Sequence, residues 1–234
     1  MGGGALALAT QRIVDKARQI AAHLLEAASA DIVLADGGFA VAGVPDRKIP
    51  WRQIAATAYG RPVPGLEPGL QETVFFDPGR EAWGFGAHVA LVRIDRETGQ
   101  PTLEKLVLVD DCGVVLNPMI VEGQVHGGIA QGIGQALLES AIYDKDGQLV
   151  TGSLMDYCMP HAHDLPSFQV GLTETKSPSN PLGIKGCGEA GAIAAPAAVI
   201  NAITDAIGTE ELAMPATAQA VWAALKSAQP RQAA

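Results

Sequence analysis

The stretch KGCGEAG, residues 185–191, places three glycines around a single acid, Glu189, and begins with Lys185. It lies between a proline-punctuated loop, residues 177–181, and an apolar run over residues 190–207. Glycine permits backbone conformations that other residues resist and lets another group approach closely. A carboxylate in such a turn, at the start of a helix, can act as a catalytic acid or base. The alternative is a loop whose glutamate favours a helix N-terminus, and these seven residues leave both interpretations open.

A second stretch, residues 117–139, predicts a helix that begins with an asparagine cap and a proline, Asn117 and Pro118. It contains five glycines. Each glycine costs about 1 kcal/mol relative to alanine in a helix interior, and a sum of about 5 kcal/mol rivals the net stability of a domain. We therefore expect these glycines to permit close packing against another backbone or a bulky cofactor.

One face of this predicted helix carries neutral polar residues and the opposite face is apolar. The polar stripe is Gln124, Gly128, Gln131 and Gln135; the apolar stripe is Val125, Ile129, Ile133 and Leu137. Amides can hydrogen-bond a polar ligand without adding charge. The stripe therefore indicates either a ligand-binding face or a polar helix face in water.

The composition narrows the class of protein. The chain of 234 residues is 48% hydrophobic but only 5% aromatic, which predicts an aliphatic core. The net charge of −9 and the lack of a basic cluster argue against a nucleic-acid partner. We expect no membrane span and no signal peptide, and the cysteine content favours a cytoplasmic protein. Three widely spaced cysteines agree with a reducing compartment and argue against an iron–sulfur cluster or structural zinc in this chain.

Periodicity predicts an α+β fold. We expect helices over residues 5–28, 50–59, 118–139, 190–207 and 218–226, strands in hairpins at 31–41, 87–109 and 140–150, a further strand at 168–174 and an extended segment at 71–76. The whole chain, 1–234, is expected to form one region or two subdomains of about 1–110 and 111–234. His161 and His163 alternate beside Asp164, but no further cluster supports a metal site, so we predict a solvated loop there and no protein metal ligands.

Several motifs, taken in order, resemble one known family. They are Asp111-Cys112-Gly113, Asn117-Pro118, the glycine-rich run 123–134 and the stretch 185–189, with further matches at 153–157 and 177–183. Together they resemble the C-terminal part of the molybdenum-binding large subunit of the xanthine oxidase family. The nearest subgroup is the carbon monoxide dehydrogenase-like large subunits of bacteria, which include aldehyde and N-heterocycle hydroxylases. The resemblance runs from Gly3 to about Leu225 and implies the second molybdenum-cofactor-binding domain, with mixed sheets and packed helices.

The resemblance also implies roles for individual residues. Glu189 matches the general base that activates the water-derived oxygen nucleophile, and burial in a glycine-walled pocket would make this carboxylate a better base. Gln124 matches a glutamine that hydrogen-bonds an oxo ligand of molybdenum, and Gly188 a glycine that lets the cofactor approach. The other residues expected at the cofactor are Gly123, Lys185, Gly186, Gly3 and Gly4. Whether Lys185 touches the pterin or pairs with an acid stays open, and Cys187 departs from the small aliphatic residue expected there.

The match covers about the last third of such a subunit, so the resemblance implies partners. These are a chain with the upstream molybdenum domain, a small subunit with [2Fe–2S] clusters and an FAD-containing medium subunit. The implied cofactor is molybdopterin cytosine dinucleotide, whose pterin holds the molybdenum. The implied substrate is an aldehyde, an N-heterocycle or a similar small molecule. Two readings remain open for the chain itself, a catalytic part of a split subunit and a non-catalytic structural or interaction remnant.

Overall fold

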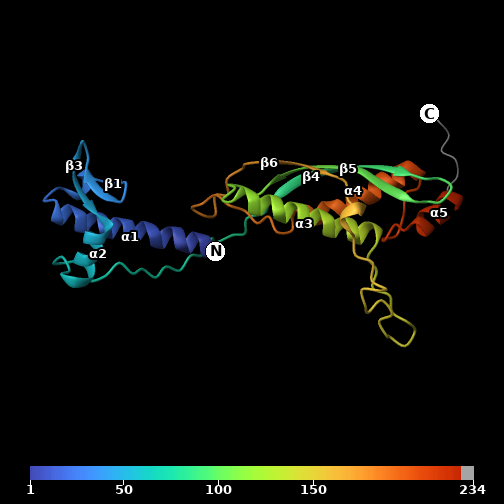
Figure 1. Ribbon diagram of the computed structural model, residues 1–234, viewed down its shortest axis with the longest axis horizontal. Coiled ribbons are helices and arrows are strands. Elements are labelled where there is room, and N and C mark those ends of the chain that lie inside the picture. The colour runs from blue at the N-terminus through green and yellow to red at the C-terminus, as the bar shows by residue number, and fades with distance from the viewer. Residues whose placement is uncertain (228–234) are drawn as a thin grey trace. The chain divides into compact units, whose positions relative to one another are not determined.

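The computed structural model describes residues 1–227 and divides the chain into two compact units. The first unit comprises residues 1–80 with 179–182, and the second comprises 81–178 with the part that follows Leu182 (Figure 1). The boundary lies after Arg80 rather than near residue 110, because strands β4 (Phe85–Ile94) and β5 (Pro101–Asp111) pair along their whole length. The last seven residues of the expected region 1–234 lie outside the described residues.

The first unit packs two helices against a small antiparallel sheet. Its elements are α1 (Gly2–Leu24), η1 (Ser29–Asp31), β1 (Ile32–Ala35), β2 (Gly38–Val41), β3 (Val44–Pro50) and α2 (Trp51–Gly60), with strand order β1-β2-β3. Phe39, Ile20 and Ile54 are fully buried in its core. The predicted hairpin and both helices are confirmed. Strand β3 was not predicted, because all but one of its residues are exposed and it shows no apolar alternation.

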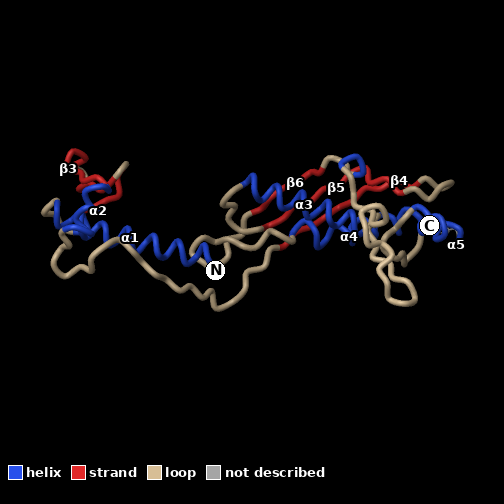
Figure 2. Tube along the Cα trace, turned by 60° about the horizontal axis from the view of Figure 1, so that its bottom comes forward, coloured by secondary structure: helices blue, strands red, loops and turns tan. Residues whose placement is uncertain are grey.

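The second unit is built on a sheet of strand order β4-β5-β6 (Figure 2). β4 and β5 form the predicted antiparallel hairpin, and β6 (Phe168–Thr173) runs parallel to β5, from the pair Leu106↔Phe168 to the pair Asp111↔Thr173. The end of β5 therefore lies beside the end of β6. This confirms an α+β fold with mixed strand pairing.

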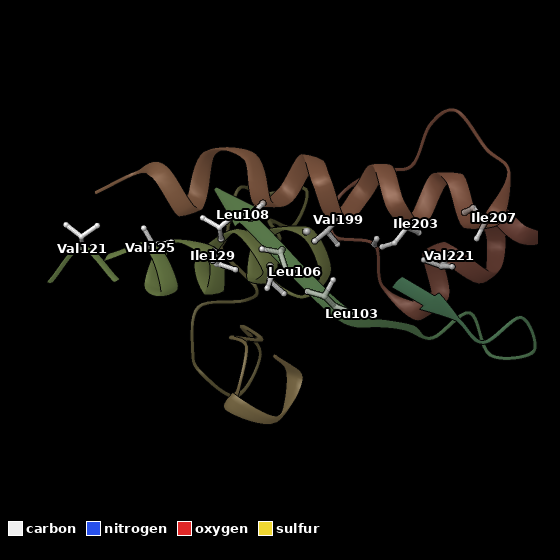
Figure 3. Close-up of a cluster of buried hydrophobic side chains, with 14 of the residues drawn as sticks. Leu103, Leu106, Leu108, Val121, Val125, Ile129, Val199, Ile203, Ile207 and Val221 are labelled. Carbon is white, nitrogen blue, oxygen red and sulfur yellow. The ribbon is translucent and has the colours of Figure 1, made fainter. Parts of the chain in front are cut away.

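Three helices complete this unit: α3 (Pro118–Leu137), α4 (Ala190–Ile207) and α5 (Ala218–Ser227). Asn117 caps α3 as predicted, since its side-chain oxygen accepts a hydrogen bond from Ile120 N at 3.2 Å. The core lies between α3, α4 and β5 (Figure 3). Its fully buried side chains include Val125, Ile129 and Ile133 of α3, Val199 and Ile203 of α4, Leu106 and Leu108 of β5, and Val221 of α5.

The glycines of α3 lie in two different surroundings, against α4 and in open space. A Cβ atom at Gly128 would lie 2.9 Å from Ala192 N, and one at Gly132 would lie 2.9 Å from Ala195 Cβ, so both permit close packing on α4. At Gly123 and Gly127 no atom lies within 4 Å of such a Cβ. The interpretation of one continuous ligand face is therefore wrong at Gly128, which is buried against α4 while its glutamine neighbours are exposed.

One prediction fails for lack of a pairing partner. The segment 140–150 makes one isolated bridge, Tyr143↔Leu149, instead of a regular hairpin, while the predicted extended segment 71–76 lies outside the strands. The expectation that no apolar run is long enough for a membrane also needs correction, because α4 is long and apolar enough by length and composition. Its residues Ala195, Val199 and Ile203 lie in the core formed with α3 and β5.

Candidate active site

The glycine-rich stretch is attached to the end of β5. Gly113 and Ile184 form an antiparallel bridge, and Lys185 N donates a hydrogen bond to Cys112 O at 2.8 Å. Gly113 has a φ of 69°, and a Cβ atom there would lie 2.3 Å from Gly183 O. Glycine is therefore required at this position, because a larger residue would meet both strain and a clash.

Asp111 at the end of β5 joins the strand to this stretch. Its carboxylate is fully buried and accepts hydrogen bonds from Lys185 Nζ at 2.9 Å, Gly113 N at 3.0 Å and Thr173 Oγ1 at 3.2 Å. Burial alone would raise the pKa of Asp111, but the hydrogen bonds, led by the one from Lys185, outweigh it and hold the pKa well below its usual range. Of the two roles left open for Lys185, the structure shows pairing with an acid.

Glu189 occupies the N-cap position of α4, but its side chain makes no capping hydrogen bond. The alternative of a helix-capping glutamate therefore agrees in position, since Glu189 lies at the N-terminus of α4, but not in a side-chain hydrogen bond. The expected burial is absent as well, since Glu189 is exposed in this chain. Its neighbours Gly186 and Gly188 have no side chains to place over the carboxylate.

A cavity of about 340 Å³ lies where the stretch meets the start of β4. Its lining consists of residues 82–86, His88, Asp110, Gly186, residues 188–190, Ile193 and Ala194. Glu189 and two of its flanking glycines thus share one cavity with the first turn of α4. The exposed side chains of Trp83, Phe85 and Ile193 give the cavity an apolar rim.

Gln124 lies next to the same stretch. A Cβ atom on Gly188 would be 3.8 Å from Gln124 Oε1, and nothing else lies within 4 Å of it. The glycines Gly123 and Gly186 also have open space where a side chain would be. The structure therefore brings Gln124, Gly123, Gly186, Gly188 and Glu189 together, although they come from two segments of the chain.

The remaining two residues of the expected site, Gly3 and Gly4, belong to the first unit. Both lie in the first turn of α1. Gly4 is buried, and a Cβ atom there would lie 2.6 Å from the ring of Phe76. Packing against Phe76 thus accounts for glycine at position 4.

Sequence reasoning missed a buried histidine–aspartate pair in the cavity lining. His88 Nε2 lies 3.5 Å from Asp110 Oδ1, and the two side chains are 1% and 4% exposed. One signal in the sequence could have revealed the pair. In each strand a polar residue stands at an inward-facing position, because His88 is flanked by exposed residues of β4 and Asp110 follows an exposed residue of β5.

The segment with His161 and His163 forms no such internal site. The two rings stack with centroids 5.5 Å apart, and both imidazoles lie near Asp164 on an exposed 3-10 turn, η2 (Ala162–Asp164). Within residues 1–227, no three histidine, cysteine, aspartate or glutamate side chains are grouped so as to hold a metal ion.

Comparison with known proteins shows the family to which the chain is similar. Residues 1–166 match the molybdopterin cofactor-binding domain. The chain is 38% identical over 229 residues to the carbon monoxide dehydrogenase large chain of Hydrogenophaga pseudoflava, and 40% identical over 232 residues to the nicotine 6-hydroxylase large subunit of Paenarthrobacter nicotinovorans. Each alignment covers 97% of this chain and 28% of the relative, so the chain spans less than a third of their length.

Solved structures agree with the sequence relatives. The Cu,Mo-CO dehydrogenase superposes with a TM-score of 0.89 at 33% identity, over 97% of this chain and 29% of that chain. Quinoline 2-oxidoreductase from Pseudomonas putida 86 superposes with a TM-score of 0.85 at 43% identity, over 93% of this chain and 28% of that chain. The fold is that of a molybdopterin cofactor-binding domain. The chain belongs to the molybdopterin cofactor-binding domain family, within the molybdenum-binding subunits of the xanthine oxidase family.

Proposed function

We propose that this chain supplies one wall of the active site of a molybdenum-dependent hydroxylase, with Glu189 as the general base. The observation that carries the proposal is the cavity in which Glu189 and its glycines meet, with Gln124 beside Gly188. The names of the relatives, a carbon monoxide dehydrogenase large chain and a nicotine 6-hydroxylase large subunit, support this class of reaction.

The residues present fit a molybdenum–pterin group. Gly123, Gly186 and Gly188 leave open space where their side chains would be, and Gln124 lies beside Gly188, which gives a bulky cofactor room to approach. The amide of Gln124 can donate a hydrogen bond without bringing a charge. When bound, the cofactor supplies the two-electron redox chemistry, and we propose its cytosine dinucleotide form.

The chain's own residues would position the reactants and hold a proton. Glu189 takes the proton of the water that provides the oxygen atom. Gln124 orients the cofactor by a hydrogen bond, while the ion pair of Lys185 and Asp111 fixes the loop that carries Glu189. Because Glu189 is exposed in this chain, we propose that the rest of the molybdenum subunit covers it and excludes bulk water.

We also propose partners and a substrate class for the chain. The chain works with the upstream part of the molybdenum subunit, with an iron–sulfur subunit that carries [2Fe–2S] clusters, and with an FAD subunit through which electrons leave. The substrate is an aldehyde, an N-heterocycle or a similarly small molecule, and the complex acts in the cytoplasm.

The variant Glu189→Gln tests whether Glu189 is the general base. It is measured in the complex purified through a tag on this chain. We expect turnover to fall by about 10²–10⁴-fold, the range typical of a lost general base, while molybdenum and pterin contents stay unchanged. Glu210→Gln, at an exposed loop position, is the matched control and should retain full turnover. Normal turnover of the Glu189 variant would overturn the assignment.

The exposure of Glu189 also allows a second candidate, a structural or interaction module that no longer meets cofactor. Metal and nucleotide analysis of the natively purified complex separates the two. Molybdenum and a pterin nucleotide in stoichiometric amounts support the catalytic proposal, and their absence supports the module.

A further inference from the structure

Two buried polar atoms in the cavity lining have no hydrogen-bond partner. They are His88 Nδ1 and Asp110 Oδ2, and their side chains both border the cavity that contains Glu189. A buried polar group without a partner costs about 1–3 kcal/mol, so such groups in a functional cavity call for an explanation. The roles assigned to Glu189 and Gln124 make no use of either side chain.

The backbone of the neighbouring strand leaves room for the carboxylate of this pair. Asp110 pairs with Gly86 across the hairpin, and a Cβ atom on Gly86 would lie only 1.9 Å from Asp110 Oδ1. Only glycine at position 86 leaves room for the carboxylate. The first turn of α4 lines the same cavity, and the positive end of a helix dipole favours a negative charge nearby.

The contact between the two side chains is also long for a hydrogen bond. The separation of 3.5 Å between His88 Nε2 and Asp110 Oδ1 exceeds the 2.7–3.2 Å that is usual for an N–H···O hydrogen bond. Rotation about Cβ–Cγ is soft for both side chains, and a half-turn of the carboxylate exchanges its two oxygens. Both groups can therefore turn toward a ligand without rearrangement of the backbone.

We propose that His88 and Asp110 form a hydrogen-bonding subsite for the substrate on the wall of the Glu189 cavity. The subsite takes a small neutral molecule that carries an N–H donor beside an acceptor, such as an amide or a lactam-like heterocycle. A carboxylate accepts hydrogen bonds, so the ligand donates to Asp110, whereas the imidazole of His88 can donate or accept. The rim of Trp83, Phe85 and Ile193 suits the apolar body of such a ligand.

This inference rests on the proposed function, because it assigns the substrate class of the same cavity. Its test uses equilibrium binding, which is independent of turnover. Benzamide and acetophenone are matched probes, since the amide NH₂ of the first is a methyl group in the second. Titration calorimetry on the purified complex gives both affinities, and we expect benzamide to bind about tenfold or more tightly than acetophenone, the worth of one hydrogen bond to a charged group.

Two variants examine the pair itself. The double variant His88→Leu/Asp110→Leu removes both polar groups at once, so neither is left buried without its neighbour, and Asp110→Asn keeps the size of the carboxylate. Both should reduce the preference for benzamide to about threefold or less. The double variant His161→Leu/Asp164→Leu removes an exposed histidine–aspartate pair and should keep the full preference.

The outcomes separate this subsite from the role of Glu189. Equal binding of the two probes by the wild-type complex, or an unchanged preference in both cavity variants, would overturn the subsite and leave the base in place. Full turnover of Glu189→Gln together with a preference lost in the cavity variants would overturn the base and leave a binding subsite.

Discussion

Lys185 Nζ lies 2.9 Å from Asp111 Oδ1 and joins two residues 74 positions apart in the chain. The two side chains are 8% and 0% exposed, so this ion pair is buried. It links the end of β5 to the loop that carries Glu189. The pair therefore decides where the proposed base lies, although neither of its members needs to touch a reactant.

Lys185→Met should destabilise the chain strongly, because it leaves Asp111 as a buried charge without a counter-ion. Loss of one partner of a buried pair predicts a melting temperature lower by on the order of 10 °C. Thermal unfolding of the full chain gives the measurement. Arg93→Met, which breaks the exposed pair with Glu104, is the control and should change the melting temperature by a few degrees at most. The double variant Lys185→Met/Asp111→Asn should recover part of the loss, and no recovery would show that the two residues act independently.

The depressed pKa of Asp111 predicts how stability changes with acidity. The folded-state pKa is lower than the unfolded value of about 3.9. The carboxylate therefore contributes stability that is fully present above the unfolded pKa and is lost as the pH falls through the folded pKa. Melting temperatures between pH 7 and pH 3 should fall more steeply below about pH 4 for the wild type than for Asp111→Asn. Parallel curves would mean that Asp111 does not contribute this dependence.

Two glycines of α3 should respond in opposite directions to alanine. Gly128→Ala places a methyl group 2.9 Å from Ala192 N and should cost about 1–3 kcal/mol through overpacking. Gly123→Ala meets open space and should stabilise the helix by up to about 1 kcal/mol. Denaturant unfolding and hydrogen exchange of the α3 amides would measure both effects. If Gly128→Ala proved stabilising, the close approach of α3 and α4 would be wrong.

Gln124→Leu should weaken retention of the molybdenum–pterin group by about tenfold, the worth of one lost hydrogen bond. The exposed position of Gln124 means that the fold itself should not suffer. Molybdenum content after dialysis of the purified complex against buffer is the readout. Gln131→Leu, on the same helix and also exposed, provides the comparison and should keep its metal. Equal retention by both variants would remove Gln124 from the cofactor site.

Local chemistry in the sequence determined most of the helices and turns. The asparagine cap and the proline at 117–118 satisfy the first turn of α3 through short-range interactions, and the hairpin of β4 and β5 follows from apolar runs around a tight turn. The motif that contains Gly188 and Glu189, with Gln124 on the glycine-rich helix, was enough to indicate the family. These features depend on neighbours in sequence, so they can be read without a structure.

Only the tertiary structure decided which distant residues meet. The parallel pairing of β6 with β5, the contact of Lys185 with Asp111 and the enclosure of His88 with Asp110 all join segments far apart in the chain. Such contacts depend on the packing of whole elements, which no local pattern encodes. For the same reason the sequence shows Glu189 only as the acid of the glycine-rich stretch, whereas its exposure and the buried pair that lines the same cavity depend on the placement of β4, β5 and α4.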